Sequence, residues 1–251
     1  MIPAGQAASH AVSPESTLLP PKGDEVEALS LALAKASPEE IIAQAVRTVG
    51  RDRLCLVSSF GTESAVLIAY MAQVDPSIPV VFLDTGWLFE ETLAYRDTLT
   101  AQLGLTDVRS IQPDAARLAE RDPDRDLWFS DPDACCLIRK VEPLARTLSD
   151  FDAWLNGRKR YQGGLRAFIP VVERDGRRLK FNPLASLDRA DVEAAHARFA
   201  LPPHPLVAKG FSSVGCMPCT SRAKPGEDAR SGRWQGKAKT ECGIHTMLSG
   251  Q

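Results

Sequence analysis

The sequence has no long apolar stretch, since none of its runs approaches the ~18–20 consecutive apolar residues that a membrane-spanning helix needs. Residues 1–23 also lack the basic start and apolar centre of a signal peptide. These two absences argue against membrane insertion and against export. We therefore expect a cytoplasmic protein that makes no contact with a membrane and whose thiols are kept reduced.

An excess of charge of either sign is also missing. The chain of 251 residues has 30 Lys and Arg against 32 Asp and Glu, a net charge of −2. Without a general positive field, binding to nucleic acid has no electrostatic support, and we expect no nucleic-acid partner. Histidine is scarce, with 4 residues, which argues against a histidine-rich metal site. No internal repeat is visible, so we expect one α/β domain, large enough to bury a core without disulfides.

What the sequence does contain is a series of short apolar runs that alternate with helical patterns. The apolar runs cover 54–58 and 80–83, residues 108–111 resemble a third strand, and the helical patterns between these segments cover 64–71 and 89–103. Strands and helices that alternate at this spacing predict a parallel twisted sheet with right-handed crossovers and flanking helices. The predicted fold class is therefore a Rossmann-like α/β domain.

Further patterns extend this prediction on both sides. Ser37 before Pro38-Glu39-Glu40 is a capping-box pattern that predicts the start of a helix. Residues 132–148 are expected to form a helix and 151–155 a strand. The Asp175-Gly176 pair predicts a hairpin turn between two further extended segments, 170–173 and 179–181.

Hydroxyl side chains gather where the first predicted strand passes into a helix, in Ser58-Ser59-Phe60-Gly61-Thr62-Glu63-Ser64. Backbone N–H groups at a helix N-terminus, together with such hydroxyls, suit a phosphate or sulfate. The loop lacks the Gly-Lys-Ser/Thr end of a P-loop. Asp84-Thr85-Gly86 closes the next strand, and ligands of open parallel sheets bind beyond such strand ends. Each loop alone could equally be a helix cap. The candidate nucleotide-binding residues are Ser58, Ser59, Gly61, Thr62, Ser64, Asp84, Thr85 and Gly86.

Six cysteines in a reducing compartment are expected to be ligands, nucleophiles or buried apolar side chains rather than disulfide partners. Cys135-Cys136 and the Cys216-x-x-Cys219 pair together supply four thiolates. Adjacent cysteines fit poorly around one tetrahedral zinc ion, whereas an iron–sulfur cluster offers a separate iron atom to each. We therefore favour a [4Fe–4S] cluster over zinc. Cys55 is interpreted as a buried strand residue.

The sixth cysteine, Cys242, stands in the polar segment Lys239-Thr240-Glu241-Cys242-Gly243-Ile244-His245. We expect it to be exposed on a flexible segment and to act as a thiolate nucleophile, with an incidental surface cysteine as the alternative. Several basic residues could converge on a phosphorylated or sulfated substrate, although each alone could be a solvated surface charge. They are Arg139, Lys140, Arg158, Lys159, Arg160, Arg230 and Arg233.

Taken together, these motifs resemble those of the assimilatory sulfonucleotide reductases, in particular the adenylyl-sulfate (APS) reductase branch. The resemblance rests on Cys-Cys-x-x-Arg-Lys at 135–140, Cys-x-x-Cys at 216–219 and Lys-x-Glu-Cys-Gly-x-His at 239–245. It implies an adenine-nucleotide-hydrolase-like fold. The implied division is a disordered arm at 1–23, a reductase domain at 24–229 and a mobile catalytic tail at 230–251.

The resemblance also implies an activity: reduction of APS to sulfite and AMP in sulfate assimilation towards cysteine. Cys242 would carry an S-sulfo intermediate, and a separate thioredoxin would supply the electrons. Cys135, Cys136, Cys216 and Cys219 would bind the [4Fe–4S] cluster. Lys140 would lie between cluster and substrate, and the remaining substrate-binding residues would be Arg139, Arg160, Arg230, Arg233 and His245. A homo-oligomer is compatible with the sequence.

One segment departs from the family pattern. Where many members read close to Thr-Gly-x-Arg-Arg-x-Gln-Ser, this chain has Asn156-Gly157-Arg158-Lys159-Arg160-Tyr161-Gln162-Gly163. The lysine keeps the charge but loses the bidentate geometry of arginine. Three alternatives stay open: a 3′-phosphoadenylyl-sulfate (PAPS) or dual reductase, an ATP-using tRNA thiolase, and a zinc-stabilised interaction module. The paired cysteines weigh against the first, the net charge against the second, and the isolated Cys242 against the third.

Overall fold

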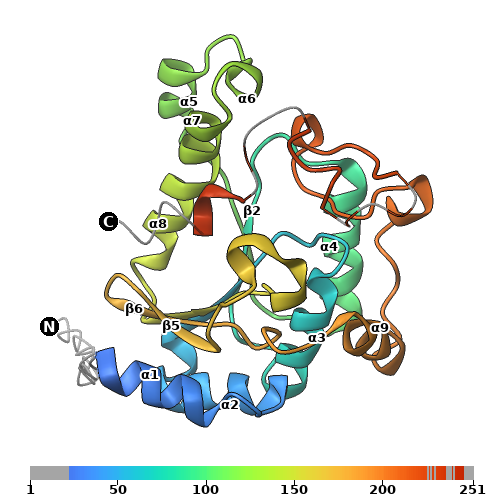
Figure 1. Cartoon of the computed structure of the whole chain (residues 1–251). Coiled ribbons are helices and arrows are strands. Elements are labelled where there is room, and N and C mark those ends of the chain that lie inside the picture. The colour runs from blue at the N-terminus through green and yellow to red at the C-terminus, as the bar shows by residue number, and fades with distance from the viewer. Residues whose placement is uncertain are drawn as a thin grey trace, which may run out of the picture.

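A six-stranded sheet forms the centre of the computed structural model, which describes residues 23–224, 226, 228, 230–235, 239 and 241–245 (Figure 1). The strand order is β3-β2-β1-β4-β6-β5. The five strands from β3 to β6 are parallel, and β5 pairs with β6 in the antiparallel sense at the edge. The strands are β1 (Leu54–Ser58), β2 (Val80–Leu83), β3 (Val108–Ile111), β4 (Ala153–Leu155), β5 (Val172–Asp175) and β6 (Arg178–Phe181). The predicted parallel sheet is confirmed, and β1 to β3 begin and end at the predicted residues.

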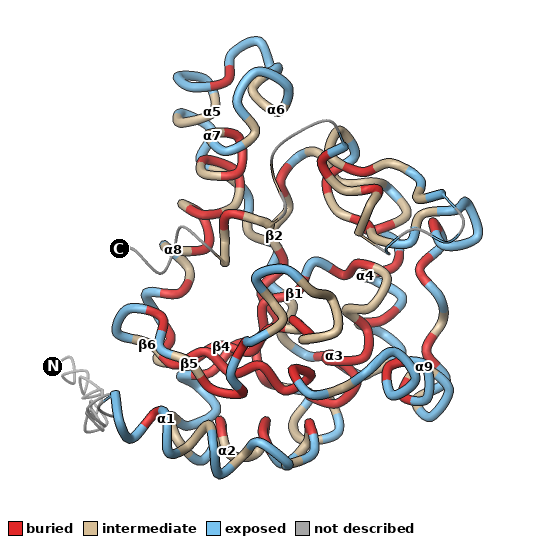
Figure 2. The backbone as a smooth tube through the Cα atoms, viewed as in Figure 1, coloured by how far each residue is buried: buried red, intermediate tan, exposed pale blue. Residues whose placement is uncertain are grey.

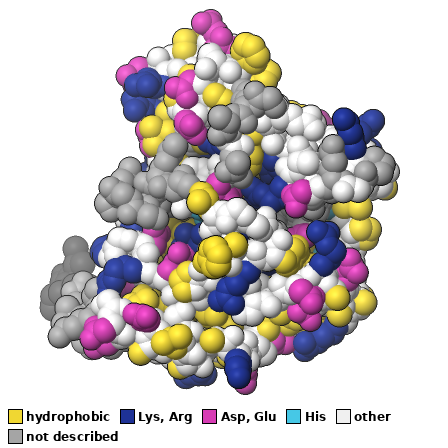
Figure 3. Space-filling model, in the orientation of Figure 1, with side chains coloured by type: hydrophobic (Ala, Val, Ile, Leu, Met, Phe, Trp, Pro, Cys, Tyr) yellow, Lys and Arg dark blue, Asp and Glu magenta, His cyan; other side chains and the backbone are white. Residues whose placement is uncertain are grey.

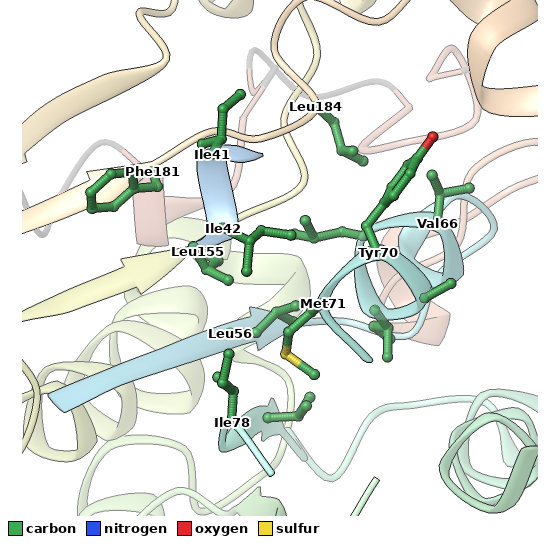
Figure 4. Packing of buried hydrophobic residues seen from close by; sticks show 14 of the residues in the cluster. Ile41, Ile42, Leu56, Val66, Tyr70, Met71, Ile78, Leu155, Phe181 and Leu184 are labelled. Carbon is green, nitrogen blue, oxygen red and sulfur yellow. The ribbon is translucent and has the colours of Figure 1, made fainter. Parts of the chain in front are cut away.

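Helices cover both faces of this sheet because successive side chains of a strand point to opposite sides. Leu56 of β1 packs into one core together with α2 (Pro38–Val49) and α3 (Ser64–Val74). Cys55, its neighbour, packs on the other face against α8 (Glu142–Leu148). Figure 4 shows the first core, and Figure 2 shows the strands among the most buried segments. Burial on both faces is typical of parallel strands, and the predicted burial of Cys55 is confirmed.

The capping box predicted at Ser37 is present: its Oγ accepts the backbone N–H of Glu40, whose carboxylate accepts the N–H of Ser37. The hairpin turn predicted at Asp175-Gly176 is also confirmed, since β5 and β6 flank it. The remaining helices are α1 (Gly23–Ala32), α4 (Glu90–Gln102), α5 (Ala115–Arg121), α6 (Leu127–Ser130), α7 (Pro132–Cys136) and α9 (Arg189–Arg198). Within the described part of the chain, no helix combines the length and apolarity needed to cross a membrane.

The helix predicted over 132–148 is interrupted in its middle. After α7 the chain forms a π-helical turn, Leu137–Val141, before α8 continues in the same direction. Pro143 follows this turn and cannot donate a backbone hydrogen bond to the preceding helix. Such single π turns widen a helix locally and often occur at functional sites. Here the turn carries Arg139 and Lys140.

Candidate functional site

The carboxyl ends of β1, β2 and β4 open into one cavity of about 220 Å³. β1 pairs with β2 on one side and with β4 on the other, so the strand order reverses beside it, and ligands of open α/β sheets bind at such a reversal. On the face shown in Figure 3, Lys and Arg side chains are visible in a recess near the middle. The residues singled out from the sequence that line the cavity are Ser58, Ser59, Gly61, Thr62, Ser64, Thr85, Lys140, Arg158, Lys159, Cys216, Arg230, Arg233, Cys242 and His245.

The loop after β1 is held in place by its own hydroxyl groups. The backbone N–H of Gly61 donates to Ser64 Oγ at 3.0 Å, and Thr62 Oγ1 donates to the carbonyl of Ser212 at 3.0 Å. A Cβ on Gly61 would lie 3.1 Å from the carbonyl oxygen of Val214, so this position favours a residue without a side chain. The loop is therefore fixed against the segment 212–214, and both line the cavity.

Glu63, in the same loop, joins it to the segment that departs from the family pattern. Its carboxylate accepts hydrogen bonds from Lys159 Nζ at 2.8 Å, Tyr161 Oη at 2.9 Å and Gln162 Nε2 at 2.9 Å. Burial would raise the pKa of Glu63, but Lys159 and the other donors outweigh it, so the pKa is lowered. Lys159 therefore serves as the partner of Glu63, a role that a single ammonium group fills well. The sequence patterns had not singled out Glu63.

Four of the predicted substrate-binding residues, Asp84, Gly86, Arg139 and Arg160, do not line the cavity. Arg139 forms a buried ion pair with Asp122 at 2.5 Å and donates to the carbonyl of Thr85 at 3.0 Å. Arg160 donates to the carbonyl of Ile169 at 2.9 Å and to Ser186 Oγ at 3.1 Å. The expectation that both arginines face the substrate is therefore corrected: each guanidinium is used to hold neighbouring segments together.

The other two residues shape the turn after β2. The carboxylate of Asp84 accepts the backbone N–H of Gly86 at 3.2 Å and Gln112 Nε2 at 3.2 Å. Gly86 has a φ of 72°, a left-handed conformation that glycine adopts without strain. Asp84 and Gly86 thereby orient Thr85, which does line the cavity, so their predicted direct contact with the nucleotide is corrected to a supporting role.

Replacing Asp122 by alanine is expected to lower the free energy of unfolding by about 3–5 kcal/mol, because Arg139 would stay buried without its counter-charge. The side chains of Arg139 and Asp122 are 5% and 0% exposed. Urea denaturation measures the change. As a control, Asp52→Ala breaks a pair with Arg51 whose side chains are 83% and 50% exposed, and less than about 1 kcal/mol is expected. Equal losses in both variants would contradict a structural role for Arg139.

Lys140 points the opposite way from Arg139 and lines the cavity among thiols. Burial alone would lower the pKa of Lys140, but the nearby thiols of Cys216, Cys242 and Cys136 outweigh it, so the pKa is raised. The π-helical turn thus sends one of two adjacent cations into the protein interior and the other into the cavity. Lys140 is therefore a half-buried positive charge close to Cys242, the cysteine that belongs neither to the two pairs nor to β1.

Cys242 is not exposed, which corrects the expectation from the sequence. Its side chain lies in the cavity, close to that of Cys136. The segment is held by Glu241, whose carboxylate pairs with Arg166 at 2.5 Å and Arg230 at 3.3 Å. Lys239 forms an ion pair with Asp133 of α7. These contacts, which no local pattern displays, explain why the thiol is enclosed.

His245 lies at the end of the same segment and also lines the cavity. Its ring stacks on Trp154 of β4, with centroids 6.2 Å apart and planes at 2°. Burial, together with the nearby Lys180 and Arg158, holds the pKa of His245 well below its usual range. No atom of the described residues hydrogen-bonds its Nδ1. The imidazole is thus neutral, and its residue forms part of the cavity wall.

The two cysteine pairs come from distant segments. Cys135 and Cys136 end α7, whereas Cys216 precedes the short 3₁₀ turn Met217–Cys219 and Cys219 ends it. Burial and the nearness of Cys216 and Cys219 raise the pKa of Cys135 to about 11. Thr85 Oγ1 lies 3.2 Å from Cys216 Sγ, which links this region to the cavity wall.

The donor set fits an iron–sulfur cluster better than a single ion. Among the residues with described positions, no three His, Cys, Asp or Glu side chains form a group that could hold one metal ion. A structural zinc ion requires four ligands around one tetrahedral centre, whereas a [4Fe–4S] cluster gives each thiolate its own iron. Soft thiolate donors from two segments, three of them buried, are compatible with the larger group.

Comparisons with known proteins cover most of the chain. A profile of the phosphoadenosine phosphosulfate reductase domain matches residues 53–222. The adenosine 5′-phosphosulfate reductase of Mesorhizobium japonicum is 54% identical over 216 residues, which cover 85% of this chain and 83% of that protein. The phosphoadenosine 5′-phosphosulfate reductase of Gloeobacter violaceus is 46% identical over 219 residues, 83% of this chain and 88% of that protein. A crystal structure of phosphoadenylyl-sulfate reductase from Candida auris, in complex with phosphate, matches with a TM-score of 0.67 and 25% identity over 78% of this chain and 96% of that chain.

Proposed function

Because the chain belongs to the phosphoadenosine phosphosulfate reductase domain family, we propose that it reduces adenosine 5′-phosphosulfate to sulfite and AMP in sulfate assimilation towards cysteine, with a thioredoxin as the separate reductant. One observation carries the proposal. A cysteine outside the two cysteine pairs, Cys242, lines the same cavity as Lys140, Arg230 and Arg233, at the end of a nucleotide-binding type of sheet. This arrangement joins a nucleophile to the cations that a phosphosulfate group requires.

In the substrate complex, the loop Ser58–Ser64 and Thr85 would contact the nucleotide, and the cations would bind the phosphosulfate. Arg166 joins this set, since it lines the cavity and donates to Glu241 of the nucleophilic segment. Lys140, Arg230 and Arg233 would neutralise the charge that grows on the phosphate as it leaves. His245, which lines the cavity, would contact the bound group.

The reaction would proceed in two displacements at sulfur. The Cys242 thiolate attacks the sulfur of the sulfate group, a bond forms between the two sulfur atoms, and the bond from sulfur to the bridging phosphate oxygen breaks. AMP leaves with that electron pair, and Cys242 carries an S-sulfo group. A thioredoxin thiolate then attacks Cys242 Sγ, and sulfite leaves with the electron pair of the sulfur–sulfur bond. The second thioredoxin thiol resolves the mixed disulfide, so the dithiol supplies both electrons.

Cys135, Cys136, Cys216 and Cys219 would hold the [4Fe–4S] cluster. When bound, it would supply electrostatic and structural support beside the cavity. The chain's own residues carry the two displacements: Lys140 lies close to Cys136 and Cys216 as well as to Cys242, so the ligand segments also fix the position of this cation. The thiols of Cys242 and thioredoxin account for the electrons without a further donor.

The choice between APS and PAPS is the sharpest test, because a relative named for the 3′-phosphorylated nucleotide is 46% identical. We expect anaerobically purified, iron-replete protein to release sulfite from APS with thioredoxin, with kcat/KM at least about 100-fold higher than with PAPS, as a site built for a hydroxyl can discriminate. Equal values would make the enzyme a dual-specificity reductase, the second candidate. No sulfite from either nucleotide would contradict the proposed function.

A further inference from the structure

The carboxylate of Glu241 accepts four hydrogen bonds in the structure. Its Oε2 accepts Arg166 Nε at 2.5 Å, and its Oε1 accepts Arg166 Nη2 at 2.7 Å, Arg230 Nη2 at 3.3 Å and the backbone N–H of Cys242 at 3.0 Å. Arg166 therefore engages both oxygens, the bidentate geometry in which arginine–carboxylate pairs are strongest and most directional. The same carboxylate fixes two guanidinium groups and the backbone of the residue that follows it.

This group differs from the ion pairs on the protein surface. The side chains of Arg166 and Glu241 are 11% and 8% exposed, and Arg230 is 20% exposed. The bound arginines lower the pKa of Glu241 although burial would raise it. A carboxylate held in this way has little freedom to leave its partners, because each guanidinium would remain nearly buried without a counter-charge.

The loop that supplies Arg166 is shaped for this contact. Gly163 and Gly164 both have left-handed φ angles, 67° and 55°, which residues with side chains rarely adopt in succession. The chain turns there so that Arg166 points into the cavity, while Leu165 and Phe168 stay 70% and 94% exposed. An arginine directed inward between outward apolar side chains indicates that its partner in the cavity determines its position.

We propose that Glu241 is the positioning residue of the nucleophilic segment: through Arg166 and Arg230 it closes residues 241–245 over the cavity and places the Cys242 thiol for attack. The inference rests on the proposed function, since it gives Cys242 the role of nucleophile. Glu241 itself takes no part in the displacements. Its carboxylate orders two cations and one thiol relative to one another before substrate arrives, which is the kind of preorganisation that raises a chemical rate.

Glu241→Gln tests this on the iron-loaded enzyme, because glutamine keeps the shape but loses the charge and one acceptor oxygen. Two results are expected. Alkylation of Cys242 by iodoacetamide, followed by mass spectrometry of its peptide, becomes about 10-fold faster or more as the segment opens. With APS and thioredoxin, kcat falls by roughly 10²-fold while KM for APS stays the same or falls, since the lost feature is alignment and not substrate affinity.

Arg166→Lys provides a second route to the same outcome, since lysine cannot bind both oxygens, and its alkylation rate should rise as well. The matched control is Glu120→Gln, which removes an exposed pair with Arg117 and should leave alkylation and kcat unchanged. Unchanged alkylation in both Glu241→Gln and Arg166→Lys would overturn the inference, as would a raised KM with an unchanged kcat. If the wild-type enzyme released no sulfite, the proposed function would fail while the alkylation rates still reported on Glu241.

Discussion

Cys242→Ser is expected to lower sulfite release by at least ~10⁴-fold, the scale seen when a covalent nucleophile is removed. A serine hydroxyl ionises far less readily than a thiol, and an O-sulfo serine has an oxygen in place of the Sγ atom with which thioredoxin would form the mixed disulfide. AMP release should stop as well, because it accompanies formation of the intermediate. Both products are measured with APS and excess reduced thioredoxin. The substitution changes one atom in a cavity whose other contacts are made by neighbouring side chains, so folding should be unaffected.

The intermediate itself can be trapped in the unaltered protein. Incubation with APS in the absence of a reductant should add one SO₃ group to the peptide that contains Cys242, and thioredoxin should remove it. Cys55→Ala is the matched control: Cys55 lies fully buried in β1, and burial raises its pKa, so it stays a protonated thiol without a chemical role. Continued turnover by Cys242→Ser, or an adduct on another residue, would show that the nucleophile has been assigned incorrectly.

β1 and β2 could be predicted from the sequence because each is a short apolar run that is buried on both faces, which is a local signal. Val80–Leu83 is an example, since its central residues are fully buried. The helix α9 (Arg189–Arg198) was missed for the opposite reason: it buries only Val192 and Ala195, so it shows no apolar stripe. Local patterns therefore predict elements that bury much of their surface and fail for those that bury little.

In the site, too, features formed by consecutive residues could be predicted, whereas contacts between distant residues could not. The Ser58–Ser64 loop was predictable because its hydroxyls and glycine are consecutive and sit at a strand end. The partnership of Glu63 with Lys159 spans 96 positions in the sequence and that of Glu241 with Arg166 spans 75, so neither is visible in a local pattern. The half-buried position of Cys242 depends on the second of these pairs, because Glu241 also accepts the backbone N–H of Cys242. This is why its exposure was predicted incorrectly.

Adjacent residues can also be separated in space by an irregular backbone. A regular helix turns about 100° per residue and would already divide Arg139 from Lys140. The π-helical turn alters that geometry, and Asp122, 17 positions earlier, captures Arg139. The Arg139-Lys140 pair in the sequence predicts positive charge near the substrate. Which of the two side chains faces the cavity depends on Asp122, the buried carboxylate that pairs with Arg139.

Substitution of any one of the four paired cysteines by serine should remove most of the bound iron, whereas substitution of Cys242 should not. A serine hydroxyl is a hard, protonated donor that replaces thiolate poorly at an iron–sulfur cluster. Cys216→Ser should have a full effect, since Cys216 is buried and its Sγ lies 3.2 Å from Thr85 Oγ1. Iron and acid-labile sulfide per chain, together with the visible absorbance of protein purified without oxygen, measure the loss.

Cys242→Ser is the most informative comparison in that series, because its thiol touches Cys136 and lies in the same cavity as Cys216. If the two sets of cysteines have separate roles, Cys242→Ser retains the iron of the unaltered protein and loses sulfite release, while Cys216→Ser loses the iron. Cys55→Ser should retain both. Stoichiometric zinc in place of iron, or loss of iron in Cys242→Ser with retention in Cys219→Ser, would assign the ligands differently. If Cys135, Cys136, Cys216 and Cys219 hold the cluster, Cys242→Ser loses turnover but keeps its iron. If Cys242 were itself a ligand of the cluster, the same substitution would lose both.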